Sequence, residues 1–202
     1  MNLFKEYAEE YLDNGYSVIP DKFRSKMPAI KNWNHYCNIL PKKEEINTWA
    51  NTIEESNIAV CLGEASGIIA IDFDCEDDDI IKAIEHLFPE SPVEKKGGKG
   101  WTRFYRYSGE ISRVISFNGK VVFEVLSTNK KTTIPPSVHT TGLTYEWTGK
   151  SLAEVDPASL PEFPPMICSG IELKLKMSFK PDTTYTNGKF SSVSLGRKNF
   201  KN

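Results

Sequence analysis

The chain has 202 residues, and its 25 Lys and Arg against 27 Asp and Glu give a formal net charge of −2. This length suits one domain, or one domain with an appendage, and 39% hydrophobic residues suffice for a core. The near-neutral charge excludes binding to nucleic acid through a strong overall positive field. Any such contact depends on local basic clusters, which are Lys95-Lys96 with Lys99, Arg103 and Arg106, and Lys130-Lys131.

The cysteines and the apolar runs bear on the cellular compartment. Four cysteines are widely spaced, at Cys37, Cys61, Cys75 and Cys168, and none forms a Cys-x-x-Cys pair. This spacing indicates neither a zinc site nor a disulfide framework, so we expect reduced thiols and a cytoplasmic protein. The N-terminus has no apolar core of signal-peptide length, and no run approaches the ~20 apolar residues of a membrane span. We therefore expect no membrane partner.

The first third of the chain predicts two helices that alternate with two strands. Helical spacing of apolar residues predicts helices over 3–12 and 42–50, and apolar runs predict strands over 16–20 and 57–62. Between the first strand and the second helix lies a loop that contains Lys26 and ends at Trp33. Its cations either reach phosphates or simply form a solvated surface, and the sequence leaves both interpretations open.

Residues 67–74 form the most informative stretch, because an apolar run ends in two carboxylates one residue apart. Apolar residues on both faces predict a strand buried within a sheet. Since side chains alternate along a strand, Asp72 and Asp74 are expected on one face, about 7 Å apart. Two like charges at that distance favour a hard cation such as Mg²⁺ or Mn²⁺ between them. Alternatively, Asp74 only begins an acidic turn into the helix predicted from Asp77.

A glycine- and lysine-rich loop over 95–100 leads into an aromatic strand over 101–107. Glycines allow close approach of the backbone, and lysines match phosphate charge, so the loop is a candidate phosphate cradle. It is not a Walker loop, because no Gly-Lys-Ser/Thr follows at the required spacing. A glycine hairpin with incidental lysines explains the same residues.

The second half of the pattern is a hairpin followed by a proline-rich loop. Asn118-Gly119 favours a tight turn before a strand over 121–126, whose apolar run is interrupted by Glu124. The loop over 134–147 contains Pro135-Pro136, several hydroxyls and His139. An imidazole in such a loop can bind an anion, although a lone His is more often simply exposed or hydrogen-bonded.

Taken in order, these stretches resemble the N-terminal domain of bifunctional DNA primase/polymerases, a branch of the archaeo-eukaryotic primase superfamily found in phages, plasmids and other mobile elements. The resemblance covers roughly residues 3–150. It rests on the ordered set Gly15-Tyr16-Ser17-Val18-Ile19-Pro20, Lys26-x-Pro28, Trp33, Ser66-Gly67, Ile71-Asp72-Phe73-Asp74, the glycine loop, Phe123-Glu124-Val125-Leu126, Pro135-Pro136-Ser137-x-His139 and Gly142-x-x-Tyr145-x-Trp147. An ordered set is far more specific than any one motif.

The resemblance implies an α/β, two-layer α+β catalytic fold with a mixed or antiparallel sheet flanked by helices. It implies that Asp72, Asp74 and Glu124 hold Mg²⁺ or Mn²⁺ for template-directed nucleotidyl transfer on single-stranded DNA with dNTP or NTP. The residues expected to bind the nucleotide are Lys99, Thr102, Arg103, Ser137 and His139.

One residue departs from the family pattern. Aligning Phe104-Tyr105-Arg106 with the aromatic-aromatic-basic end of the second family motif places Thr102 where a His usually stands. Threonine brings no positive charge, so two other functions stay open. One is a catalytically degenerate module that binds nucleotide, single-stranded DNA or a replication partner, and the other is a metal-dependent nuclease that also uses clustered acids.

The Pro-rich stretch over 161–165 marks the expected domain boundary. We expect a catalytic domain over 1–165, followed by a linker or partly ordered tail over 166–202. Gly196-Arg197-Lys198-Asn199 resembles the segment that, in relatives, opens a following helical domain. The chain is thus compatible with a fragment of a longer protein that has a helicase domain or partner.

Overall fold

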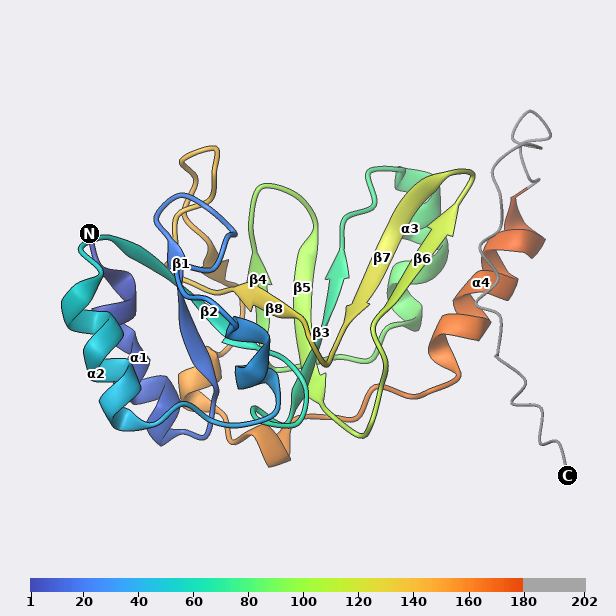
Figure 1. The fold of residues 1–202 in the computed structure, drawn as a ribbon. Coiled ribbons are helices and arrows are strands. Elements are labelled where there is room, and N and C mark those ends of the chain that lie inside the picture. The colour runs from blue at the N-terminus through green and yellow to red at the C-terminus, as the bar shows by residue number, and fades with distance from the viewer. Residues whose placement is uncertain (180–202) are drawn as a thin grey trace, which may run out of the picture.

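The computed structural model describes residues 1–179, which form two antiparallel sheets flanked by helices (Figure 1). The smaller sheet has the order β1-β2-β8, with β1 at Val18–Lys22, β2 at Ser56–Cys61 and β8 at Lys131–Thr133. The larger sheet has the order β6-β7-β3-β5-β4-β9. Its strands are β3 (Ile68–Phe73), β4 (Glu94–Lys96), β5 (Trp101–Arg106), β6 (Arg113–Phe117), β7 (Lys120–Leu126) and β9 (Glu146–Trp147). The expected α+β fold is confirmed.

Helices α1 (Leu3–Asp13) and α2 (Lys43–Thr52) lie beside the smaller sheet (Figure 1). The first helix begins where Asn2 caps it, because the Asn2 side chain accepts a hydrogen bond from the Lys5 amide at 2.9 Å. The second begins at Lys43, and Glu45 in its first turn accepts a hydrogen bond from the Lys42 amide at 2.8 Å. Both helices lie within two residues of the expected bounds, and both strands expected in this third are β1 and β2.

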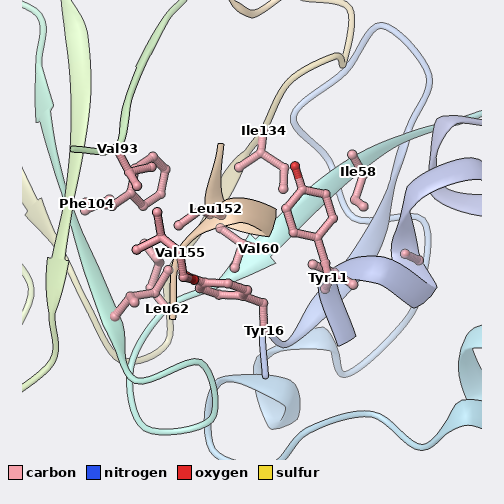
Figure 2. Packing of buried hydrophobic residues seen from close by; sticks show 14 of the residues in the cluster. Tyr11, Tyr16, Ile58, Val60, Leu62, Val93, Phe104, Ile134, Leu152 and Val155 are labelled. Carbon is pink, nitrogen blue, oxygen red and sulfur yellow. The ribbon is translucent and has the colours of Figure 1, made fainter. Parts of the chain in front are cut away.

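The main core fills the space between α1, the smaller sheet and one face of the larger sheet (Figure 2). Tyr16 is fully buried in this core, and its hydroxyl donates to the Val155 carbonyl at 2.7 Å. The buried hydroxyl is therefore satisfied, as a polar group in a core must be. The other members that Figure 2 labels are Tyr11, Ile58, Val60, Leu62, Val93, Phe104, Ile134 and Leu152.

Strand β3 lies in the middle of the larger sheet, between β7 and β5. Its alternating side chains serve two cores, because Ile68 and Ala70 face the main core while Ile69, Ile71 and Phe73 face a second one. The prediction of a strand buried on both faces is confirmed. The second core is covered by α3 (Asp78–Ile84) and α4 (Ile167–Ser178).

Shorter elements complete the described part of the chain. The β6–β7 hairpin turns at Asn118 and Gly119, whose φ angles of 49° and 73° confirm the predicted turn. Four short 3₁₀ helices are η1 (Trp33–Cys37), η2 (Glu85–Leu87), η3 (Leu152–Glu154) and η4 (Pro157–Ser159). Among residues 1–179, no helix combines the length and the apolar character needed to cross a bilayer.

Helix α4 lies within the stretch over 166–202 that was expected to be a linker or partly ordered tail. Cys168, Ile171 and Leu175 recur at helical spacing and are buried against the second core, so this stretch is part of the folded domain. Lysines and serines interleave with these apolar residues, and that composition hid the helical period from the sequence analysis. The expected tail and the Gly196-Arg197-Lys198-Asn199 segment otherwise lie outside the described residues.

The packing of α4 can be tested with two leucines of the same helix. Leu175 is 1% exposed and Leu173 is 59% exposed. Leu175→Ala should lower the free energy of unfolding by about 2–5 kcal/mol, because it opens a cavity in the second core. Leu173→Ala should change it by less than about 0.5 kcal/mol. Urea denaturation of both variants measures this, and equal effects would place α4 outside the cooperative domain.

Candidate functional site

A row of side chains from four neighbouring strands crosses one face of the larger sheet. The strand register pairs Glu124 of β7 with Asp72 of β3, Asp72 with Thr102 of β5, and Thr102 with Lys95 of β4. Directly paired residues project from the same face, with Cβ atoms about 5 Å apart. The order of side chains in the row is therefore acid, acid, hydroxyl, cation. The row lies on the face of β3 that also carries Ile68 and Ala70, earlier in the strand.

A cleft of about 650 Å³ opens over the middle of this row. Its walls come from the acidic end of β3, the glycine loop, β8 with the loop before it, and the loop that contains His139. Charged residues of both signs line it. They are Asp72, Asp74, Lys26, Lys95, Lys99, Lys130 and Lys131. Five lysines against two aspartates make the cleft cationic although the whole chain is slightly acidic.

The two aspartates meet at the cleft, although only one belongs to the strand. Asp72 is half-buried within β3, whereas Asp74 lies one residue beyond the strand and is exposed. Partial burial and the nearby Asp72 charge raise the pKa of the Asp74 carboxyl above its usual value. Two carboxylates that disfavour each other's charge form a suitable site for a hard divalent cation.

Glu124 neighbours Asp72 in the row but does not line the cleft. Among residues 1–179, no three His, Cys, Asp or Glu side chains are gathered closely enough to hold a metal ion. The sheet thus places all three predicted acids on one side of the molecule, and it brings only Asp72 and Asp74 together at the cleft. This geometry still fits Mg²⁺, which is commonly held by one or two carboxylates together with substrate phosphates and water.

Thr102 contacts Asp72 directly, because its hydroxyl donates to Asp72 Oδ1 at 2.6 Å. A threonine hydroxyl has a single proton to donate. That proton is committed to the carboxylate, so in this structure Thr102 orients Asp72 and has no further donor for a phosphate. Thr102 lines the cleft, and its role in binding a nucleotide stays a prediction.

Close packing leaves no room for a side chain at two positions of the glycine loop, Gly97 and Gly100. Gly100 has φ +51°, and a Cβ at this position would lie 1.7 Å from the Phe73 carbonyl oxygen. A Cβ on Gly97 would meet the Tyr145 ring at 2.7 Å, whereas one on Gly98 would have only His139, at 4.0 Å. The loop is therefore pressed against the end of β3, beside Asp74, while Gly97, Gly98 and Lys99 line the cleft.

Alanine at two positions of this loop should separate packing from flexibility. Gly100→Ala adds a clash with backbone atoms to the cost of a left-handed residue, so the free energy of unfolding should fall by about 2 kcal/mol or more. Gly98→Ala meets open space and should cost less than about 1 kcal/mol. Thermal and urea unfolding of the two proteins provide the comparison. Equal stabilities would mean that the loop does not pack against Phe73 as described.

Arg103, predicted to bind the nucleotide, does not line the cleft in this structure. Its Nε donates to Glu94 Oε2 at 2.7 Å, and its guanidinium lies 4.1 Å from the Trp101 ring centroid. Trp101 belongs to the second core, on the face opposite Thr102. Neighbouring residues of a strand project from opposite faces of the sheet. Because Thr102 faces the cleft, Arg103 faces the other side.

Ser137 is also absent from the cleft wall, and its burial explains why. Its hydroxyl accepts from the Ile58 amide at 2.9 Å and donates to the Ile58 carbonyl at 3.1 Å. Both hydrogen bonds fasten the loop to β2, and Asn57 adds two more through the backbone of Val138 at 2.8 and 3.0 Å. Ser137 therefore fixes the loop that presents His139.

His139 lines the cleft opposite the glycine loop. Its Nδ1 accepts a hydrogen bond from the Thr141 amide at 3.2 Å. Because that nitrogen is an acceptor, this hydrogen bond assigns the proton of the neutral ring to Nε2. The predicted position of His139 at the site is thus consistent with the geometry, and the ring retains one donor for a ligand.

A family model adds an independent comparison. The model for the N-terminal domain of bifunctional DNA primase/polymerases, named Prim-Pol, matches residues 8–163. The chain belongs to this family. The match spans both sheets and every strand of the cleft, and it ends four residues before α4 begins. No curated protein matches the chain.

Several residues of this Prim-Pol cleft were not singled out from the sequence as site residues. Trp33, Lys26, Lys131 and Tyr145 line it, as does Lys95, which is only 5% exposed. The sequence did indicate the direction of the Lys95 side chain. Lys95 stands two residues after Val93, and strand alternation places both on the same face. The charge of Lys95 masked that inward direction. Lys26 and Lys131 reach the cleft only through tertiary contacts, which the sequence does not reveal.

Proposed function

We propose that this Prim-Pol domain catalyses template-directed nucleotidyl transfer on single-stranded DNA, with Mg²⁺ or Mn²⁺ held at Asp72 and Asp74. The observation that carries the proposal is the pair of carboxylates at the rim of a cleft that five lysines make cationic. A metal–triphosphate ligand needs both signs of charge in one site, and both line this cleft. Replication of a phage or other mobile element is the setting that the family resemblance favours.

The donor set supports this assignment of the metal. Carboxylate oxygens are hard ligands that suit Mg²⁺ and Mn²⁺, and the described cleft has no cysteine among its lining residues. A bound ion would activate the primer hydroxyl and screen the charge on the triphosphate. In this proposal Glu124 is the third acid, supporting Asp72 from the neighbouring strand, and Thr102 holds Asp72 in its orientation.

The remaining walls of the cleft provide places for the rest of a nucleotide. Lys99, Lys26 and Lys130 supply mobile positive charge for phosphate oxygens, because lysine ammonium groups on exposed stems adapt to a ligand. Trp33, Leu143 and Tyr145 provide apolar surface for the base and sugar. The Nε2 of His139 is a further donor toward phosphate or a sugar hydroxyl. Each of these roles is part of the proposal.

Asparagine in place of the two aspartates tests the metal site while preserving side-chain size. Asp72→Asn and Asp74→Asn should each reduce primer extension and de novo priming by about two orders of magnitude or more, as expected when a transition-state charge loses its stabilising group. Extension with four dNTPs and Mn²⁺ on a primed single-stranded template measures this.

Asp78→Asn, on the exposed first turn of α3, is the matched control and should keep full activity. Asp74→Asn should not lower stability, because burial and Asp72 already disfavour the charge that it removes. Full extension by the Asp72→Asn/Asp74→Asn double variant would exclude the proposed metal site. Glu124→Gln in the same assay reports whether the third acid contributes.

Lys99 and its partner Glu76 offer a paired test of phosphate binding. The two side chains form an exposed ion pair at the cleft rim. Lys99→Ala should weaken dNTP binding about threefold to tenfold, because one adaptable cation is lost. Glu76→Gln should leave binding unchanged or tighten it, because Lys99 is released. Calorimetric titration of dATP at fixed Mn²⁺ checks both, and weaker binding in both variants would mean that the ion pair only shapes the loop.

A second candidate function is favoured by the hydrogen bond between Thr102 and Asp72. Because Thr102 brings no charge, the domain could bind nucleotide without transferring it, as a module within a larger replication protein. Metal-dependent dATP binding by calorimetry together with no extension on any template would support this function. Cleavage of labelled DNA with Mn²⁺ alone would instead indicate a nuclease.

A further inference from the structure

Lys95 differs from the other lysines of the cleft in the burial of its charge and in the partners of its ammonium. Lys131 donates to Asp21 Oδ2 at 2.7 Å and to the Lys26 carbonyl at 2.8 Å, and Lys99 pairs with Glu76. Lys26 and Lys130 are exposed to water. Lys95 is 5% exposed, and within residues 1–179 its ammonium has no hydrogen-bond or ion-pair partner.

The surroundings of Lys95 compensate its positive charge only in part. Its Nζ lies 4.7 Å from the centroid of the Tyr145 ring, so a cation–π contact gives it partial compensation. Burial lowers the pKa of Lys95 to about 8, although the Asp72 charge opposes that shift. A largely buried ammonium without an acidic partner costs free energy. Such a cost is understandable when a ligand supplies the missing anion.

The strand register places this cation where a ligand beside Asp72 would meet it. Lys95 follows Thr102 in the row, and both residues line the cleft. Since Thr102 donates its only proton to Asp72, the next donor along the row is the Lys95 ammonium. We propose that Lys95 binds the triphosphate of the incoming nucleotide and supplies the positive charge that Thr102 does not.

This inference rests on the proposed function only in naming a nucleotide as the source of the phosphates. The anion subsite itself follows from Lys95, the Tyr145 ring that holds it and the open Gly98 backbone beside the cleft. Lys96 is the natural control, because it is the next residue on the same strand, is exposed and does not line the cleft.

The test measures binding rather than catalysis. Inorganic tripolyphosphate in EDTA, and then dATP with Mn²⁺, are titrated calorimetrically into wild type, Lys95→Met, Lys95→Arg and Lys96→Met. Lys95→Met should weaken both ligands about 10–100-fold, as expected for the loss of one charge-assisted hydrogen bond. Lys95→Arg should retain part of the affinity, and Lys96→Met should match wild type. Binding by Lys95→Met that equals that of Lys96→Met would overturn the proposal.

Thermal unfolding distinguishes a ligand-binding lysine from a structural one. Methionine removes a buried charge and keeps the length of the side chain, so Lys95→Met should be as stable as wild type or more so. A marked loss of stability with unchanged tripolyphosphate binding would make Lys95 structural and refute the inference. Should Lys95→Met not fold, Lys95→Gln provides the same comparison.

A gain-of-function variant separates this inference from the proposed function. In Lys95→Thr/Thr102→His the charge is moved one strand along the row, so the double variant should bind tripolyphosphate more tightly than Lys95→Thr alone. No recovery would count against a shared subsite for the two positions. If tripolyphosphate binding depends on Lys95 but wild type extends no primer, the anion subsite stands and nucleotidyl transfer fails. If wild type extends primers and Lys95→Met does so equally well at low dNTP, nucleotidyl transfer stands and the anion subsite at Lys95 fails.

Discussion

The register of the larger sheet is the constraint on which the site depends. A shift of one residue between β3 and β5 would turn Thr102 away from Asp72 and bring Arg103 into the cleft, because strand side chains alternate between faces. The buried side chains of the second core prevent that shift. Ile71 and Phe73 of β3 and Tyr105 of β5 are packed beneath the sheet, so the core fixes the order of charges above it.

The cleft brings together opposing charges that would each be unfavourable alone. Asp74 is held beside Asp72, and Lys95 is held away from water, yet the two kinds of charge lie on neighbouring strands and in adjoining loops. A buried ion pair that includes Lys131 of the cleft wall shows the contrast. Asp21 and Lys131 neutralise each other, with Thr133 also donating to Asp21 Oδ2 at 2.7 Å. Within residues 1–179, Asp74 and Lys95 have no comparable ion-pair partner, and both line the cleft.

Two loops complete the cleft, and each is fixed by contacts that do not involve a ligand. Gly100 lets the glycine loop pass against the Phe73 carbonyl, and Ser137 with Asn57 attaches the His139 loop to β2. These residues explain why the family pattern includes positions that face away from the cleft. A motif in a sequence combines residues that touch the ligand with residues that position them, and only geometry separates the two kinds.

The sequence alone determined the helices α1, α2 and α3, the main strands and the hairpin at Asn118-Gly119, because local spacing and turn chemistry carry those features. It could not determine which neighbours of a strand acid share its face, since register depends on packing between distant segments. Arg103 and Ser137, which the sequence assigned to the ligand, therefore do not line the cleft, and the burial of Lys95 against it was not predicted. Helix α4 was missed for a related reason, because its apolar stripe becomes recognisable only against the core that it covers.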